Sequence, residues 1–462
     1  MTQERLAAGL SRPNCPAAAG RMISVTDLPA AGALAPPIDD RLPSIFDELE
    51  RRGAIAQTTG ATALAAALAS GPITFYCGFD PTARSLHIGH LVQLVTMRRI
   101  QRAGHRPLGL VGGATGLIGD PRMSGERVLN SPDVVAGWVD RIRGQVERYL
   151  DFDGAFAARI VNNLDWTGDL SAIGFLRDIG KHYRMGRMLA KETVAARLNS
   201  DEGLSFTEFS YQILQGLDYL ELYRRYGCTL QSGGNDQWGN LVSGTELIHK
   251  VEGAGVHAFT TPLLTKADGT KFGKTEGGAI WLDPELTSPY AFYQFWFNAD
   301  DRDVDRYLRT LSFRTEEELD HLAVATSERS NARAAQRALA GEVTALVHGE
   351  QARDAVVTAS AALFGSGELA AVDEATIGAA LTEAGLSTTA EPAPSVVELL
   401  RLTGLASSLS EARRVVAEGG ANINNRRITD PQHLAGPDEW LHGRYLVLRR
   451  GKRAVAGVLL QR

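Results

Sequence analysis

The chain has 462 residues, of which 44% are hydrophobic and 22% are charged, a composition typical of a globular enzyme with about two to four domains. The apolar runs fall short of the roughly 18 residues that a membrane helix needs, which excludes a membrane span. The net formal charge is −6, which argues against a polyanion-binding surface over the whole chain.

Residues 1–40 are rich in Ala and Pro and show no hydrophobic periodicity, which predicts a disordered leader. They lack the basic start and apolar block of a secretory signal, and Met22 is an alternative start. A transit peptide is disfavoured because the leader contains acidic residues, namely Glu4, Asp27, Asp39 and Asp40.

Three cysteines, Cys15, Cys77 and Cys228, lie far apart, and no two of them have metal-ligand spacing. This pattern predicts no disulfide, no structural metal site and a reducing, cytoplasmic compartment.

Residues 41–288 alternate short β-rich runs with amphipathic helical stretches, as at Ile73–Cys77 and Pro107–Val111. Because such alternation arises when helices cross over between parallel strands, it predicts an α/β domain with a parallel sheet. Open sheets of this kind bind ligands at the carboxyl ends of their strands, so the following loops are candidate site segments.

The first such segment follows the strand that ends near Cys77 and leads through a Gly and Pro turn into a helix. A helix start supplies unpaired N–H groups and a partial positive charge, which suits a phosphate. His87 and His90, three residues apart, are expected to point at one anion, and Gly89 leaves room for a nucleotide. Two surface histidines that happen to open a helix are the alternative. Zinc is disfavoured, because helical ligand pairs usually lie four residues apart.

A second segment, Lys266–Trp281, carries Lys271 and Lys274 among several glycines, which predicts a mobile loop. Two lysines three residues apart on such a loop suit a triphosphate, where they stabilise charge on departing pyrophosphate. A solvated basic loop is the alternative reading.

The predicted helix Ser205–Leu220 carries Tyr211, Gln215 and Asp218 at i, i+4 and i+7, which places them on one face. A phenol, an amide and a carboxylate on a buried face are costly unless they bond a partner. That partner is either a ligand or another part of the chain.

Two further loops complete the candidate site. Val111–Asp120 is rich in glycine and ends in a carboxylate, although it does not fit the phosphate-loop pattern. Gln231–Asn240 contains Gly234, Asp236 and Gln237.

Residues 289–376 lose the strand signal, and a single helical stripe indicates an all-helical domain, at Leu339, Val343, Leu346 and Val347. Residues 377–394 are predicted to be a linker because Ser, Thr, Ala, Glu and Pro dominate Ser387–Pro394. Residues 395–462 mix helices with short strands such as Tyr445–Leu448, which predicts a small α+β module.

The last module is basic although the chain is acidic. From Leu400 to Arg462 there are eleven Lys or Arg and five Asp or Glu, a net of +6, so the preceding residues carry −12. A helix capped by Ser408 or Ser410 presents Arg413 and Arg414, which favours a polyanion contact over a solvated charged face.

Taken together, these segments resemble the class I aminoacyl-tRNA synthetases over residues 41–462. His87-Ile88-Gly89-His90 resembles the first signature of the family, and Tyr76–Thr82 resembles its tyrosine-specific branch. Residues 271–275, Lys-Phe-Gly-Lys-Thr, resemble the second signature, Lys-Met-Ser-Lys-Ser, with glycine in place of the central serine. The resemblance implies a Rossmann-like catalytic domain, a helical tRNA-binding domain and a C-terminal RNA-binding module.

The resemblance also implies roles for individual residues. Those implied to stabilise charge in catalysis are His87, His90, Lys271, Lys274 and Thr275. Those implied to bind tyrosine are Tyr76, Asp80, Asp120, Tyr211, Gln215, Asp218 and Gln237. Those implied to bind ATP are Gly78, His87, Gly89, His90, Gly234, Asp236 and Lys274.

The implied reaction is the activation of tyrosine by ATP, followed by transfer of the tyrosyl group to tRNA(Tyr). The resemblance also implies that Mg²⁺ arrives bound to ATP and that the enzyme is a homodimer. A tryptophan-specific synthetase is the nearest alternative, and it is disfavoured because an indole has no phenol oxygen to satisfy both Tyr76 and Asp218. A nucleotidyltransferase is a further alternative, and it is disfavoured because such an enzyme needs neither the lysine loop nor an RNA module. A catalytically inactive RNA-binding relative is disfavoured because both histidines and both lysines are present.

Overall fold

The computed structural model describes residues 44–461 except 123–124, 126–128, 202, 268, 271, 273, 276–277, 365–366 and 452–453. The side chains of residues 192, 274 and 275 also lie outside the description. The predicted leader and Lys271 therefore fall outside the described residues. Within the described part of the chain, no helix is long and apolar enough to cross a membrane.

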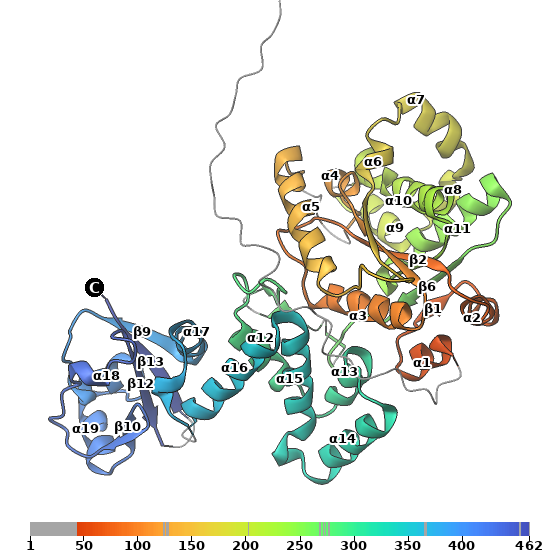
Figure 1. Ribbon diagram of the computed structural model, residues 1–462. Coiled ribbons are helices and arrows are strands. Elements are labelled where there is room, and N and C mark those ends of the chain that lie inside the picture. The colour runs from red at the N-terminus through yellow and green to blue at the C-terminus, as the bar shows by residue number, and fades with distance from the viewer. Residues whose placement is uncertain are drawn as a thin grey trace, which may run out of the picture.

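The α/β body contains a six-stranded sheet with the order β1-β6-β5-β2-β3-β4 (Figure 1). All neighbouring strands run parallel except β1, which pairs antiparallel with β6 at one edge. The strands are β1 (Gln57–Thr58), β2 (Thr74–Phe79), β3 (Arg106–Val111), β4 (Arg159–Asn162), β5 (Cys228–Gly234) and β6 (His257–Thr261). The predicted parallel sheet is thus confirmed.

Each face of this sheet has its own hydrophobic core, because successive strand side chains point to opposite faces. Along β2, Phe75, Cys77 and Phe79 face one cluster with helices α3 (Ile88–Arg102) and α5 (Pro132–Glu147). Tyr76 faces the other cluster with α10 (Phe206–Tyr226) and α11 (Trp238–Glu252). The Tyr76 side chain therefore points to the face of the sheet opposite that of Phe75, Cys77 and Phe79.

The strand order reverses at β2, because the chain winds outward to β3 and β4 and then returns to β5 on the other side. The carboxyl ends of β2 and β5 thus border the switch point where open α/β sheets bind ligands. The loops that meet there begin after Phe79, Val111 and Gly234. These are three of the five segments in which the sequence placed site residues.

Shorter elements complete the α/β body. Its remaining helices are α1 (Ile45–Arg51), α2 (Ala61–Ala69), α4 (Thr115–Ile118), α6 (Leu164–Thr167), α7 (Ala172–Gly174), α8 (Met185–Leu189) and α9 (Glu192–Leu198). Single turns η3 (Phe175–Ile179, a π-helix), η4 (Gly180–His182) and η5 (Asn235–Gln237) accompany them, and β7 (Lys274–Thr275) pairs with β8 (Gly278–Ala279).

The described part of residues 289–376 contains helices and no strand, in line with its prediction. Its helices are α12 (Pro289–Phe297), α13 (Val304–Leu311), α14 (Glu316–Glu328), α15 (Ala334–His348) and α16 (Glu350–Leu363), with turns η6 (Ser330–Ala332) and η7 (Leu369–Ala371). The stripe on α15 is buried at Leu339, Val343 and Val347. Its burial joins the helices into one core with the sheet face that carries α3.

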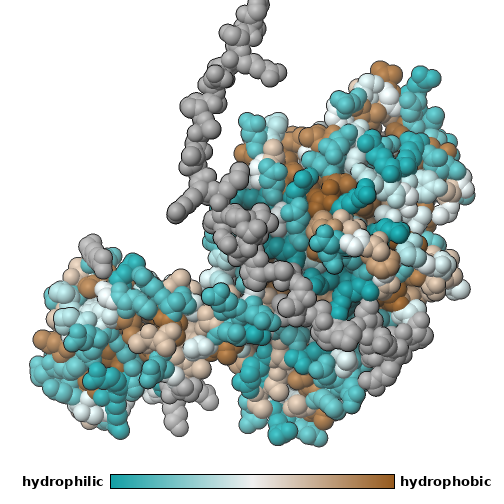
Figure 2. Space-filling view, viewed as in Figure 1, coloured by the Kyte–Doolittle hydropathy of each residue, from teal (hydrophilic) through white to brown (hydrophobic). Residues whose placement is uncertain are grey.

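The C-terminal unit has a five-stranded sheet with the order β11-β10-β12-β13-β9. Its elements are β9 (Leu386–Thr389), α18 (Val396–Leu402), α19 (Leu409–Ala417), β10 (Ala421–Ile423), β11 (Arg426–Ile428), η8 (Pro437–Glu439), β12 (Tyr445–Arg450) and β13 (Ala454–Leu460). Figure 2 shows this unit as a separate lobe whose visible face carries many hydrophilic side chains.

The predicted linker at residues 377–394 is wrong for most of its length. Residues 374–385 form α17 (Glu374–Gly385), and 386–389 form β9, which pairs parallel with β13. The buried Ile377, Ala380 and Leu381 lie at helical spacing, and Gly457 of β13 packs closely on Leu381. The apolar face of α17 contains small alanines, which give a weak hydrophobic pattern. The composition of this segment therefore indicated a linker where the structure has a packed helix and an edge strand.

Candidate active site

The deepest part of the site holds a tyrosine and an aspartate. Tyr76 is 1% exposed, and its hydroxyl has no hydrogen-bond partner among the described residues. Burial, and then the nearby Asp218, raise the pKa of Tyr76 well above its ordinary value. Because a buried hydroxyl without a partner is costly, this group is available to a ligand.

Asp218 is held by two donors from the segment after β4. Its carboxylate accepts from Asn163 Nδ2 at 3.0 Å and from Trp166 Nε1 at 2.9 Å. Burial raises the pKa of Asp218 to about 7, although both hydrogen bonds oppose that rise. A carboxylate with two oxygens accepts further hydrogen bonds, so Asp218 retains capacity for a ligand hydroxyl.

A second carboxylate, that of Asp80 in the loop after β2, faces Tyr211 of α10. Tyr211 donates its hydroxyl to Asp80 at 2.6 Å, and Thr115 donates to the other oxygen of Asp80 at 2.7 Å. A Cβ at Gly112 would lie 2.1 Å from the Asp80 carboxylate, so this loop needs glycine. Burial and then Asp80 and Asp120 raise the pKa of Tyr211, which shows that several carboxylates surround one phenol.

Asp120 belongs to a third polar cluster, near the end of β5. It accepts from Gln237 Nε2 at 3.1 Å and from Asn240 Nδ2 at 3.3 Å, and Asn240 accepts from Lys191 Nζ at 2.7 Å. Burial lowers the pKa of Lys191, whereas Asp120 and Asp236 raise it. The cluster therefore places one ammonium beside two carboxylates.

Gln215 is half-buried, and its amide oxygen has no hydrogen-bond partner in the part of the chain that the structure describes. It lies one turn from Tyr211 on α10. Gly234 ends β5, and a Cβ there would lie 2.6 Å from a carboxylate oxygen of the exposed Asp236. These residues border the same end of the sheet.

The histidine turn caps its own helix. His87 Nδ1 accepts from the Gly89 N–H at 3.0 Å, and His90 Nδ1 accepts from the His87 N–H at 3.1 Å. A neutral ring whose Nδ1 accepts carries its proton on Nε2, so both rings are assigned as Nε2–H donors. The desolvated surroundings and then His87 lower the pKa of His90 well below its ordinary value, so it is neutral near pH 7.

The expectation that this helix start offers unpaired N–H groups is wrong for its first turn. The N–H groups of His87 and Gly89 bond the imidazoles, the Ile88 N–H bonds the Ile280 carbonyl, and the His90 N–H bonds the His87 carbonyl. A Cβ at Gly89 would lie 2.8 Å from the His87 ring, so the glycine makes room for the imidazole. The main-chain N–H groups of this first turn are therefore bonded within the protein.

The segment after the lysine loop pairs with this turn. The Ile88 N–H donates to Ile280 at 3.1 Å and the Leu282 N–H donates to Leu86 at 2.9 Å, while His87 and Trp281 rings lie 6.2 Å apart. Lys274 and Thr275 contribute main chain to β7, and Lys271 lies outside the described residues. The segment that follows the second signature is thus bonded to the first signature through the main chain.

Sequence reasoning missed several residues that hold the site together: Thr115, Asn163, Trp166, Lys191 and Asn240. Thr115 and Asn240 lie in segments already singled out, and Asn163 and Trp166 follow a strand, which is the available signal. No sequence pattern indicated Lys191.

Gly78, which was predicted as a site residue, is exposed near the end of β2.

Comparison with known proteins defines the class. The family model for class I tRNA synthetases (W and Y) matches residues 68–365, and the model for the Tyrosine--tRNA ligase SYY-like C-terminal domain matches residues 379–456. The first match covers more than half of the chain. The chain therefore belongs to the class I aminoacyl-tRNA synthetases, in the branch for tryptophan and tyrosine.

Relatives narrow the assignment. The tyrosine--tRNA ligase of Streptomyces coelicolor is 63% identical over 90% of this chain and 98% of its own length. That of Acidothermus cellulolyticus is 64% identical over 90% and 98%. A C-terminally truncated mitochondrial tyrosyl-tRNA synthetase of Coccidioides posadasii is 31% identical with a TM-score of 0.61, over 69% of this chain and 92% of that one. The chain belongs to the tyrosine--tRNA ligase family.

Proposed function

We propose that the protein joins L-tyrosine to ATP to form tyrosyl-adenylate and pyrophosphate, and then transfers the tyrosyl group to tRNA(Tyr). The observation that carries the choice of amino acid is the pair of buried groups Tyr76 and Asp218 at the closed end of the site. One group donates and the other accepts, which matches a phenol hydroxyl. Phenylalanine leaves the Tyr76 hydroxyl without a partner, at about 1–3 kcal/mol, and gives Asp218 no donor beyond Asn163 and Trp166.

The other end of the amino acid carries an ammonium and a carboxylate. Asp80, Asp120 and Tyr211 are the groups proposed to hold the ammonium, together with the unpartnered amide oxygen of Gln215. Converging carboxylates favour a cation electrostatically. Gln237, which already donates to Asp120, is proposed to lie beside the substrate carboxylate.

ATP is proposed to lie across the carboxyl ends of β2 and β5. Gly78 and Gly89 border its phosphates, and Gly234 and Asp236 border its ribose. His87 and His90 donate from Nε2 to the phosphate oxygens, and ATP arrives as its Mg²⁺ complex. Lys271, Lys274 and Thr275 are proposed to contact the pyrophosphate as it departs.

The first step is an in-line displacement. A carboxylate oxygen of tyrosine attacks the α-phosphorus, a new P–O bond forms, and the bond to pyrophosphate breaks. In the second step, a hydroxyl of the terminal ribose of tRNA attacks the tyrosyl carbonyl carbon, and AMP leaves. No residue forms a covalent intermediate, because positioning and charge stabilisation supply the acceleration.

The tRNA contact, the cytoplasmic location and the oligomeric state are proposed from surface charge, from the cysteines and from the family. The basic C-terminal unit, with Arg413 and Arg414 exposed on α19, suits the phosphates of tRNA. Cys77 and Cys228 are buried free thiols, which suits a reducing cytoplasm. A homodimer is proposed by analogy with the family.

The deciding experiment is tyrosine-dependent exchange of labelled pyrophosphate into ATP. Exchange with tyrosine alone supports the proposal, whereas exchange driven by tryptophan, or no exchange at all, refutes it. Lys274→Ala should slow adenylate formation far more than it weakens tyrosine binding. Equal losses in both would contradict the proposed role of Lys274 on the departing pyrophosphate.

A further inference from the structure

Helix α13 contacts the lysine loop near its start and the histidine helix α3 at its end. The two contacts lie on opposite ends of one short helix, Val304–Leu311. Because the proposed ATP site needs histidines and lysines at fixed separation, an element that touches both supports is a candidate positioning device.

The start of α13 holds the beginning of the lysine loop. The Tyr307 hydroxyl donates to the Thr265 carbonyl at 2.8 Å, and the Arg306 guanidinium donates to the Thr265 hydroxyl at 3.2 Å. The carboxylate of Asp303 accepts the Ala267 N–H at 3.0 Å. Three side chains of α13 and its N-cap thus bond the loop before its lysines.

Phe272 attaches the middle of the loop to α13 and to the neighbouring helix α12. Its ring centroid lies 4.3 Å from Tyr307, 4.6 Å from Phe295 and 5.3 Å from Trp296, and its N–H donates to the Leu264 carbonyl at 3.0 Å. Aromatic pairs at these separations contribute beyond simple burial. Phe272 directly follows Lys271 in the sequence and precedes Lys274 by two residues, so its docking fixes one point of the loop between the two lysines.

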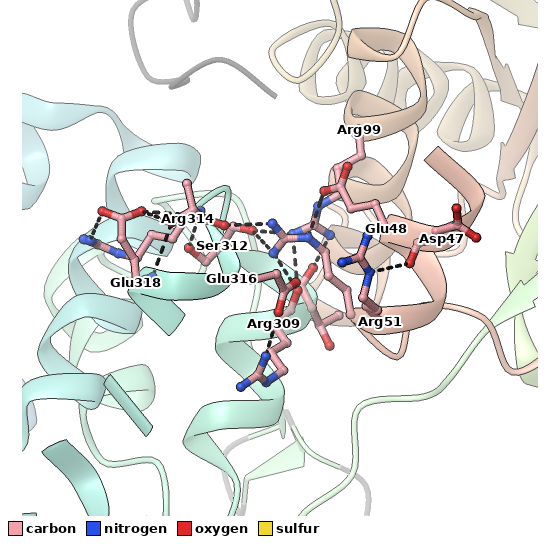
Figure 3. A network of polar contacts seen from close by, with 12 residues as sticks. Asp47, Glu48, Arg51, Arg99, Arg309, Ser312, Arg314, Glu316 and Glu318 are labelled. Atoms are coloured by element: carbon pink, nitrogen blue, oxygen red, sulfur yellow. Dashed lines mark hydrogen bonds and ion pairs between the residues drawn. The ribbon is translucent and has the colours of Figure 1, made fainter. Parts of the chain in front are cut away.

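The end of α13 is hydrogen-bonded to an arginine of the histidine helix α3. Arg99 of α3 donates to the Ser312 carbonyl (Figure 3). It also donates to the Thr310 carbonyl at 2.6 Å, and its guanidinium lies 5.2 Å from the Phe313 ring. The last carbonyls of a helix have no partner within it, and a cation suits their negative end. Arg99 is 3% exposed, so this contact is made away from solvent.

A second arginine reinforces the contact. Arg52, which caps α1, donates to the Ser312 carbonyl at 3.1 Å and to the Arg314 carbonyl at 2.8 Å. Glu48 pairs with Arg52 at 2.8 Å and with Arg99 at 3.7 Å, so one carboxylate compensates two buried cations. Buried charges that are paired in this way hold a specific geometry, because displacement would separate the cations from Glu48 and from the carbonyls.

We propose that α13 positions the lysine loop against the histidine helix, with Phe272 and Arg99 as the positioning residues at its two contacts. This inference rests on the proposed ATP roles of the two signatures. The path is continuous: His87 and His90 open α3, Arg99 near the end of α3 grips α13, and α13 holds Phe272 between the lysines. Neither positioning residue is proposed to touch ATP.

The test uses the full-length protein and begins with Phe272→Ala. The rate constant for adenylate formation should fall roughly 10- to 100-fold, the range expected for small displacements of a catalytic group, with the tyrosine Kd unchanged. Phe272→Leu keeps an apolar side chain and should lose less. Phe297→Ala is the matched control, because Phe297 lies on α12 and stacks on Tyr293 instead of the loop.

The decisive measurement repeats Phe272→Ala in a Lys274→Ala background. If Phe272 acts by placing Lys274, the second change should have little further effect on the rate constant. A full additional loss there, a parallel loss of tyrosine affinity, or an equal loss in Phe297→Ala would overturn the inference. Thermal unfolding of each variant identifies misfolding, and Phe272→Leu then carries the same comparison.

Arg99→Lys tests the other end of α13, since lysine keeps the charge and loses the forked geometry. It should lower the same rate constant without changing the tyrosine Kd. An unchanged rate would overturn the part assigned to Arg99. Failure of the proposed function is seen separately, because the unaltered protein would then show no tyrosine-dependent exchange.

Discussion

Trp166 offers a sharp test of how the phenol end of the site works. Its indole N–H donates to Asp218 at 2.9 Å, and this bond holds the pKa of Asp218 lower than burial alone would. Trp166→Phe keeps an aromatic ring and removes the donor. A hydrogen bond to a charged group contributes about 1.5–3 kcal/mol, so the pKa of Asp218 should rise by about 1–2 units.

The consequence for binding depends on pH. With a pKa of about 7, Asp218 is about half ionised at pH 7 in the unaltered protein. After a rise of about 1–2 units, about a tenth to a hundredth remains ionised, so tyrosine affinity should fall roughly 5- to 50-fold at pH 7. At pH 9 most of the loss should disappear, because the carboxyl ionises again in the variant.

The assay is the tyrosine Kd of both proteins from pH 6 to pH 9, by equilibrium dialysis. Trp440→Phe is a matched control, because it removes an indole donor that bonds the Pro392 carbonyl in the C-terminal unit. A loss of affinity in Trp166→Phe that is the same at every pH would refute the reasoning, since it would point to lost packing instead of a changed ionisation.

Three further outcomes are expected. Arg197→Met removes the buried partner that lies 3.1 Å from the Glu208 carboxylate, and urea titration should show a loss of about 3–5 kcal/mol, whereas a loss within error would contradict the pairing. Asp218 has a folded pKa of about 7 against about 3.9 unfolded, so its ionisation costs stability as pH rises. The unfolding free energy of the unaltered protein relative to Asp218→Asn should therefore fall by up to about 4 kcal/mol from pH 4 to pH 8; a rise would reverse the assigned sign. The double variant Arg413→Ala with Arg414→Ala should keep pyrophosphate exchange and weaken tRNA charging, with a difference that shrinks at high salt; unchanged charging would exclude this helix as a tRNA contact.

Much of the fold followed from patterns with a local physical cause. The alternation of β-rich and helical runs predicted the parallel sheet, and the capping serine before Leu409–Ala417 was one of the two residues named, Ser408. Topology then brought the loops after β2, β3 and β5 to one edge, as expected for the carboxyl ends of parallel strands. The proposed site residues in these three loops therefore lie at one edge of the sheet.

Other features were inaccessible because they depend on which side chains meet. The spare N–H groups predicted for the histidine turn are bonded by its own imidazoles. That outcome depends on the rotamers of two rings, which spacing does not specify. Likewise, α17 was missed because its apolar face became evident only against β13.

By itself the sequence determined the class of chemistry, since two histidines at a helix start and two lysines among glycines are local patterns. Its resemblance to the family also named Tyr76 and Asp218 as the residues that complement a phenol. Only the tertiary structure decided how Asp218 is held by Asn163 and Trp166, and how α13 joins the two ATP signatures through Arg99 and Phe272. Those partners lie tens to hundreds of residues apart in the chain, and only folding brings their atoms within hydrogen-bonding or packing distance.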